Sequence, residues 1–266
     1  MISKITSGIC LVGIAKDEEK FLDEWLVYHK MLGIDHFVLY DNSPELPLKK
    51  LLKFHSEYVT VIPWTGDLTS HNQLDAYRHA AANYILAFEW VIFLDVDEFI
   101  VLRQHSNLSS FLSEFQTASA ISLNWHVFGH NGYYDDPEIL ITSALTRRMF
   151  MPSIRVKTFT KVKDILEITS PHHCKLKSGI RVDANNHSFK NEIYLNKTVK
   201  AHINHYQCRS FSRWVGRATR GDANFNQYNC PPEQLWRLSY ESCLKQFVTT
   251  VALNKNEYVD EFLQGY

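Results

Sequence analysis

The chain has 266 residues, with 28 Lys or Arg against 29 Asp or Glu, so its formal net charge is −1. Its 45% hydrophobic and 21% charged residues are typical of a globular protein and exclude a wholly disordered chain. The near-zero net charge argues against binding of nucleic acid through an overall positive field, so we expect no nucleic-acid partner.

The five cysteines have no paired spacing and form no Cys-x-x-Cys pattern, which disfavours a disulfide framework and a structural zinc site. A reducing compartment is the natural expectation for such a chain. The apolar run at residues 8–15 is too short for a signal peptide or a membrane span. We therefore expect a cytoplasmic protein, attached at most peripherally to the inner face of a membrane.

The first hundred residues alternate between apolar runs and helical periodicity. The pattern predicts three helices, at residues 18–32, 46–55 and 72–88, with Gly33 ending the first. The apolar runs between them predict strands at 9–14, 36–40, 59–63 and 90–94. Fully apolar strands separated by helices indicate a parallel sheet that is covered on both faces, in an α/β fold.

The second half of the chain is less regular. Its patterns predict helices at residues 108–114, 210–220 and 233–254, and strands at 120–125, 153–160 and 199–205. Residues 126–141 are rich in Gly, Asp and Pro and are typical of a functional loop. The simplest prediction is one domain over residues 1–266, with halves at 1–105 and 106–266.

Polar residues follow each of the four predicted strands in the first half. They are Lys16, Asp17 and Glu18; Asp41, Asn42 and Ser43; Trp64, Thr65 and Asp67; and Asp95, Asp97 and Glu98. Ligands bind beyond the carboxyl ends of the strands in open parallel sheets, so these four loops predict one nucleotide-sized site.

The strongest signal is Asp95-Val96-Asp97, directly after an apolar strand. In an extended segment the two carboxylates would face the same way, and Mg²⁺ or Mn²⁺ often binds one or two carboxylates together with substrate phosphates. The alternative is a solvated acidic turn. The sequence contains no Gly-x-Gly-x-x-Gly, no phosphate-binding Gly-x-x-x-x-Gly-Lys and no Gly-x-Ser-x-Gly, which disfavours dinucleotide folds, P-loop proteins and α/β-hydrolases.

Taken together, these residues resemble glycosyltransferase family 92 and the related family-2-like transferases, over roughly residues 9–221. The matching positions are Lys16-Asp17-Glu18, Glu24-Trp25, Tyr28-His29, Leu32-Gly33, Tyr40-Asp41-Asn42-Ser43, Gln73, Ala76-Tyr77, His79, Trp90, Asp95-Val96-Asp97-Glu98-Phe99, Trp125, Phe128-Gly129, His205-Tyr206 and Arg220-Gly221. Two positions depart from the family pattern: Asp17, where Asn is more typical, and Arg209, where Lys is frequent.

The resemblance implies a GT-A type fold with a Rossmann-like, mostly parallel sheet flanked by helices and a less regular acceptor part. Residues 1–105 would bind a nucleotide-sugar donor, usually a UDP-sugar such as UDP-galactose, and residues 106–266 a glycan acceptor for surface polysaccharide or glycoconjugate synthesis. The implied donor-binding residues are Lys16, Asp17, Asp41, Gln73, Tyr77, Asp95 and Arg220. The implied cofactor is Mn²⁺ or Mg²⁺, held by Asp95, Asp97 and His205, with His173 as the second choice of histidine.

An inverting transfer needs a carboxylate that takes the proton of the acceptor hydroxyl, and the family leans toward inversion. The candidates in the 126–141 loop are Asp135, Asp136 and Glu138. The spacing of Arg209, Arg213, Arg217 and Arg220 predicts one basic helix face, either for phosphate of the donor or of a lipid-linked saccharide acceptor at a membrane, or simply a solvated surface.

Two other functions stay open at this point. A sugar-phosphate nucleotidyltransferase would use a similar fold, but no Gly-rich loop with Arg or Lys follows the first strand to hold a triphosphate. A non-catalytic sugar-binding module is disfavoured by the paired carboxylates at a strand end.

Overall fold

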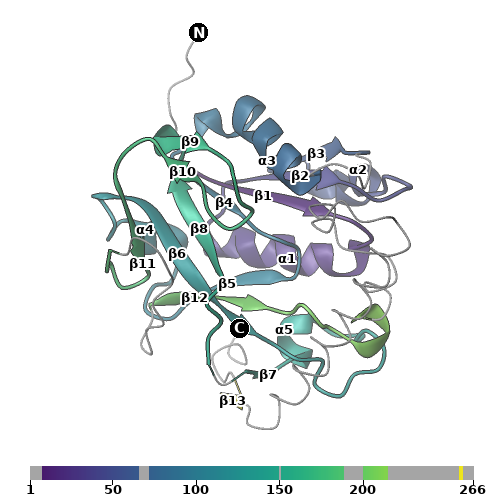
Figure 1. Cartoon of the computed structure of the whole chain (residues 1–266). Coiled ribbons are helices and arrows are strands. Elements are labelled where there is room, and N and C mark those ends of the chain that lie inside the picture. The colour runs from purple at the N-terminus through teal and green to yellow at the C-terminus, as the bar shows by residue number, and fades with distance from the viewer. Residues whose placement is uncertain (1–7, 66–71, 150, 189–199, 215–257, 260–266) are drawn as a thin grey trace, which may run out of the picture. The chain divides into compact units, whose positions relative to one another are not determined.

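Four parallel strands build the first part of the sheet in the computed structural model, which describes residues 8–65, 72–149, 151–188, 200–214 and 258–259. They are β1 (Ile9–Ala15), β2 (His36–Asp41), β3 (Val59–Pro63) and β4 (Trp90–Phe93). Strand β1 pairs with β2 and β4, and β2 pairs with β3, all parallel. The resulting order β3-β2-β1-β4 places the carboxyl ends of all four strands at one edge (Figure 1).

The sheet continues with strands from the second half of the chain. Strand β8 (Val156–Lys161) runs antiparallel to β4 and to β6 (Ala118–Val127), and β12 (Ala201–His205) and β5 (Glu98–Leu102) complete the path. Strand β11 (Ile180–Asp183) pairs parallel with β6. The smaller strands β7 (Arg147–Arg148), β9 (Ile165–Glu167), β10 (Lys175–Leu176) and β13 (Tyr258–Val259) form two separate pairs.

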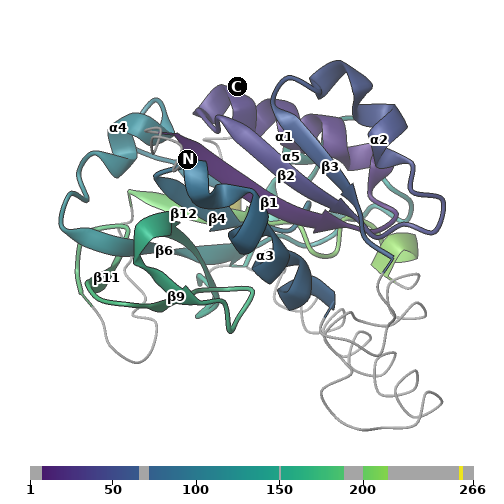
Figure 2. The same ribbon diagram turned by 90° about the horizontal axis from the view of Figure 1, so that it is seen from above.

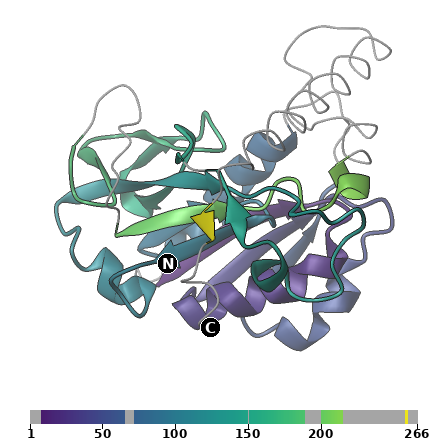
Figure 3. The ribbon, with the colours of Figure 1, turned by 90° about the horizontal axis from the view of Figure 1, so that it is seen from below.

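Two helices cover opposite faces of the parallel strands (Figures 2 and 3). Successive side chains of a strand point to opposite faces. Cys10 and Val12 of β1 accordingly belong to the core beneath α3 (Asn72–Asn83). On the other face Trp25 of α1 (Glu19–Leu32) packs on Phe37 of β2, with ring centroids 5.8 Å apart. The predicted α/β fold, with parallel strands covered by helices on both faces, is confirmed.

The boundaries of the elements refine the expectations. The predicted helix at 72–88 ends at Asn83 and is followed by the separate 3₁₀ turn η2 (Ile85–Ala87). The predicted helix at 46–55 is the short α2 (Leu48–Leu51) joined to η1 (Leu52–His55). Gly33 ends α1 as predicted, with a φ of 104° that favours glycine. The other short helices are α4 (Leu108–Leu112), α5 (Ile141–Ala144) and η3 (Val162–Asp164).

The second half of the chain departs further from its predicted elements. The strand expected at 153–160 begins at Val156. Strand β5 is not among the predicted strands, because its first residue, Glu98, belongs to an acidic stretch that is typical of a loop. Residues 211–214 begin the helix expected at 210–220. The remainder of that helix, with Arg217 and Arg220, lies outside the described residues, and so does the helix expected at 233–254.

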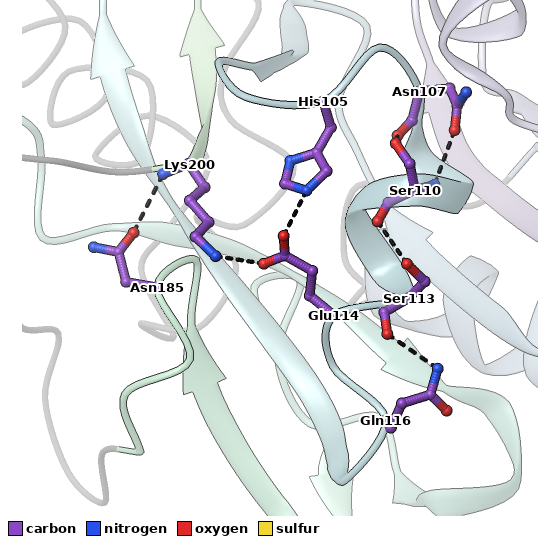
Figure 4. Close-up of polar contacts among 8 residues, drawn as sticks. All are labelled: His105, Asn107, Ser110, Ser113, Glu114, Gln116, Asn185 and Lys200. Atoms are coloured by element: carbon purple, nitrogen blue, oxygen red, sulfur yellow. Dashed lines mark hydrogen bonds and ion pairs between the residues drawn. The ribbon is translucent and has the colours of Figure 1, made fainter.

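A polar network fixes the chain around α4. The Asn107 side chain caps the helix by accepting from the Ser110 amide at 2.9 Å, an interaction that satisfies an otherwise unpaired N–H (Figure 4). After the helix, Glu114 accepts from His105 at 2.8 Å and forms an ion pair with Lys200, the residue before β12 (Figure 4). The network thus ties the α4 segment to a strand that is distant in sequence.

The chain divides into two compact units. The first contains residues 1–66, 73–125 and 153–203, and the second contains 67–72, 126–152 and 204–266. The single domain with halves at 1–105 and 106–266 stays a prediction. Within the described ranges, no helix combines the length and the apolar character that crossing a membrane would require.

Helix α1 is attached to strand β5 by hydrogen bonds from three side chains. The Trp25 indole donates to the Glu98 carbonyl at 2.9 Å, and the Tyr28 hydroxyl donates to the Ile100 carbonyl at 2.7 Å. The buried His29 ring accepts the Ile100 amide at Nε2, while its Nδ1 donates to the Trp25 carbonyl at 2.8 Å. These partners fix the neutral tautomer of His29, and burial lowers its pKa to about 3.

We expect His29 to make the fold sensitive to acid. Because its pKa is about 3 in the folded state, against about 6.5 in an unfolded chain, only the unfolded state takes up a proton between these values. His29 should therefore contribute stability that is fully present above pH 6.5 and lost as the pH falls toward 3. Below pH 6 its contribution should fall by about 1.4 kcal/mol per pH unit.

Urea unfolding of the wild type and His29→Gln between pH 7 and pH 4 would measure this contribution. A glutamine side chain can donate and accept hydrogen bonds but does not titrate, so the variant should lose stability less steeply with acid. The same slope in both chains would contradict the assignment.

Candidate functional site

The loops after β1, β2 and β3 are joined to one another by hydrogen bonds. The Asn42 amide donates to the Ala15 carbonyl at 2.8 Å, and its side chain donates to the Trp64 carbonyl at 2.6 Å. The Asp17 amide donates to the Ser43 hydroxyl at 3.1 Å. The predicted convergence of these loops at one edge of the sheet is therefore confirmed.

Asp17 adopts a left-handed backbone conformation. Its φ is 57°, in the left-handed region that Asn and Asp tolerate better than other non-Gly residues. An Asn or an Asp satisfies this turn equally well in backbone terms, so the departure from the family pattern costs little. Lys16 and Asp17 are both partly exposed beside the linked loops.

Asp41 supports the turn between β2 and α2. Its carboxylate accepts from the Ser43 amide at 3.1 Å and from the Leu48 amide at 2.8 Å, and the residue is only 1% exposed. The family resemblance implies a place near the nucleoside for Asp41; in the structure it orders the loop that carries Asn42 and Ser43.

Asp95 follows β4 and is held on both of its oxygens. Gln73 of α3 donates to Oδ1 at 2.7 Å, and Lys157 of β8 donates to Oδ2 at 3.1 Å. Gln73 is itself oriented by the hydroxyl of the fully buried Tyr77, at 2.9 Å. Tyr77 therefore supports Gln73 from the core, while the Asp95 side chain stays about one third exposed, with a relative accessibility of 35%.

The Asp95-Val96-Asp97 segment is a tight turn, and the expectation of an extended segment is wrong. The Glu98 amide donates to the Asp95 carbonyl at 3.1 Å, which reverses the chain between β4 and β5. The side chain of Glu98 also folds back and accepts the Asp95 amide at 3.0 Å. Alternation along a strand thus does not orient Asp95 and Asp97; the turn does, and Asp97 is 7% exposed.

Lys157 and Glu98 form a buried ion pair under this turn. The two charged groups are 3.2 Å apart, and both side chains are fully buried. Burial alone would lower the pKa of Lys157, but the carboxylates of Asp95 and Glu98 outweigh it and keep the amine protonated. Burial also raises the pKa of Glu98 well above its usual value, although Lys157 opposes this shift. Lys157 is a site residue that the sequence analysis does not predict.

His172 and Trp125 are a second feature near the same turn. The His172 Nδ1 donates to the Val156 carbonyl at 3.0 Å, and the ring packs edge-on against Trp125 with centroids 5.3 Å apart. Burial, reinforced by Lys157, lowers the pKa of His172 to about 4, so the ring is neutral and its Nε2 can accept a hydrogen bond. The spacing of the adjacent His172-His173 pair does not reveal this orientation.

Trp64 packs against Tyr40 and His79 at the ends of the strands. The Trp64 and Tyr40 rings are 5.0 Å apart, and the Tyr40 hydroxyl hydrogen-bonds to His79 at 2.8 Å. This cluster joins β2, the residue after β3 and helix α3.

The predicted acceptor residues are best described within the second compact unit. Asp136 forms an ion pair with Arg213 at 2.8 Å and accepts from the Ser210 hydroxyl at 2.7 Å. Burial of Asp136 alone would raise its pKa, but Arg213 and Ser210 outweigh it and lower that pKa below its usual value. Asp135 and Glu138 are exposed on the same loop.

The predicted basic helix face is not present in its first part. Arg209 is 2% exposed and has a φ of 47°, so it precedes the helix in a left-handed turn and does not share a helix face with Arg213. Arg213 forms an ion pair with Asp136.

His205, the predicted metal ligand, ends β12 and is 5% exposed.

The residues after β4 include Asp95 and Asp97, the two carboxylates that the sequence analysis expects to hold a divalent cation. Mg²⁺ and Mn²⁺ favour oxygen ligands and often take one or two protein carboxylates plus substrate phosphates. Asp95 and Asp97 supply such oxygens. In the described part of the chain, no group of three or more His, Cys, Asp or Glu side chains is arranged to hold a metal by itself.

Comparisons with known proteins place the chain in a family. A glycosyltransferase family 92 protein of Ricinus communis is 28% identical over 65% of this chain and 32% of its own length. A family 92 protein of Oryza sativa is 28% identical over 65% of this chain and 30% of its own length. The chain thus spans about a third of the length of the curated relatives it matches.

Among solved structures, Staphylococcus aureus TarS residues 1–349 shares 12% sequence identity with a TM-score of 0.42, over 90% of this chain and 72% of that one. The family model of glycosyltransferase family 92 matches residues 6–241, which is most of the sequence. The chain therefore belongs to glycosyltransferase family 92.

Proposed function

We propose that this protein is a glycosyltransferase that moves a sugar from a nucleotide-sugar donor, a UDP-sugar, to a glycan acceptor. The observation that supports the proposal is the fixed orientation of Asp95 in the turn after β4, in a chain of family 92. There Asp95 is oriented by Gln73 and Lys157 at the edge where the loops of β1–β3 also converge. A transferase of this kind should release free UDP, whereas a nucleotidyltransferase would release pyrophosphate.

The proposed cofactor is Mn²⁺ or Mg²⁺, which Asp95 and Asp97 would hold. His205 stays a ligand that only the family resemblance implies. When bound, the cation offsets the negative charge that develops on the leaving diphosphate as the glycosidic bond breaks. The protein's own contribution is positional: the bonds to Asp95 keep its carboxylate in one orientation before the donor arrives.

Binding of the donor should depend on the cation and on Asp97. We expect UDP to bind in the presence of Mn²⁺, and Asp97→Asn to weaken this binding by roughly ten- to a hundredfold, because a carboxylate ligand is lost. Calorimetry with and without a chelator would measure both effects.

The matched control for this experiment is Asp23→Asn, since Asp23 is an exposed carboxylate on α1 that pairs with His55 at 3.3 Å. It should leave UDP binding unchanged. Equal affinity in wild type and Asp97→Asn, or full binding in excess chelator, would overturn the assignment.

The base that accepts the acceptor proton is proposed to be Asp135 or Glu138 rather than Asp136. Asp136 is the weaker candidate, because Ser210 and Arg213 bind its two carboxylate oxygens and lower its pKa below the usual value. We expect Asp135→Asn or Glu138→Gln to reduce kcat by roughly a hundredfold or more while UDP affinity is retained.

Asp136→Asn should instead destabilise the fold, because it removes the carboxylate that pairs with Arg213. Measuring kcat, UDP affinity and the melting temperature for the three variants separates these roles. If Asp136→Asn alone abolishes turnover in a normally stable protein, Asp136 is the base after all.

A further inference from the structure

A buried lysine lies directly beneath the turn that carries the Asp-x-Asp motif. Lys157 is the second residue of β8, between β4 and β6, and its side chain is fully buried. Its ammonium group is 3.1 Å from Asp95 Oδ2 and 3.2 Å from Glu98 Oε2. An ammonium in the protein interior requires compensation of this kind, and in the described part of the chain these two carboxylates are its ionic partners.

Lys157 has no access to solvent, so it acts on a ligand only through its partners. Asp95 is the partner that reaches the surface, with its side chain 35% exposed. Gln73 and Lys157 bind opposite oxygens of this carboxylate, which leaves it a single orientation. Glu98 forms the second ion pair of the ammonium and also accepts a hydrogen bond from the Asp95 amide. Lys157 and Glu98 together thus hold both the side chain and the backbone of Asp95.

We propose that Lys157 is the positioning residue of the donor site: it orients the Asp95 carboxylate and supplies the positive charge that compensates Asp95 and Glu98. This inference rests on the proposed donor site. Lys157 comes from a strand about 60 positions away in sequence from Asp95, so it couples the geometry of the turn to the β4–β8 pairing.

A second possibility is that Lys157 merely compensates the buried Glu98. The two roles are separated by comparing Lys157→Met with the double variant Lys157→Met/Glu98→Gln. The single variant leaves Glu98 as an unpaired buried carboxylate and is expected to fold poorly. The double variant removes both charges together, and the carboxamide oxygen that it introduces at position 98 can still accept the Asp95 amide, so it should fold.

The matched control is Lys161→Met on the same strand. Lys161 is also buried, at 9% exposure, but its amine donates to the Gln116 carbonyl at 2.8 Å and lies over the Trp90 ring. The substitution is therefore the same in chemistry and in strand, and it leaves Asp95 untouched.

The experiment measures UDP binding with Mn²⁺ by calorimetry, together with the melting temperature of each variant. We expect the double variant to be folded and to bind UDP roughly ten- to a hundredfold more weakly, and Lys161→Met to bind as the wild type does. Adding Asp95→Asn should weaken UDP binding in the wild type but add little in the double variant, because Asp95 is then already misplaced.

The outcomes are distinguishable. If the folded double variant binds UDP as tightly as the wild type, or if Asp95→Asn has its full effect in that background, Lys157 only compensates Glu98 and the positioning role is wrong. If the wild type itself does not bind UDP with Mn²⁺ or Mg²⁺, the proposed donor class fails, and the positioning role fails with it.

Discussion

One buried charge, the Lys157 ammonium, lies between the two carboxylates Asp95 and Glu98. Lys157 must be compensated, because removing one partner of a buried ion pair costs on the order of 3–5 kcal/mol. Its compensation by Asp95 and Glu98 links strand β8 to the turn after β4 and to the first residue of β5. Lys157, Asp95 and Glu98 therefore neutralise a buried charge in the core and at the same time orient the partly exposed Asp95 carboxylate.

Strand β5, which follows that turn, is held by neutral hydrogen bonds from α1. Trp25, Tyr28 and His29 donate to or accept from the backbone of β5, which lies at the end of the sheet path. An end strand has unpaired backbone groups along one edge, and side chains of α1 satisfy several of them. The Trp25 and Tyr28-His29 positions that carry the family resemblance thus anchor β5 to α1.

Sequence reasoning succeeds where a local pattern determines the structure. Strands β1–β4 are continuous apolar runs, and α1 has a clear period and a glycine stop, so their positions follow from the residues alone. Strand β5 escapes prediction because Glu98, its first residue, is buried through an ion pair that forms only in the folded chain. Lys157 escapes for the same reason: a lysine in a strand normally indicates a solvent-facing position, and its partners lie about 60 residues away.

The residues expected to touch the donor divide into two layers once their contacts are known. Tyr77 and Asp41 are buried and hold other residues in place, whereas Asp95, Lys16 and Asp17 retain exposed surface at the converging loops. Two of the exposed groups are backed by buried ones: Tyr77 orients Gln73, which orients Asp95, and Asp41 orders the turn whose Ser43 hydroxyl receives the Asp17 amide. Because the supporting layer is polar and inside the core, its loss changes the geometry of the site as well as the stability of the fold. The residues that carry the family resemblance therefore include both buried supporting residues and partly exposed ones. Their hydrogen-bond partners distinguish the two groups, which the sequence alone does not.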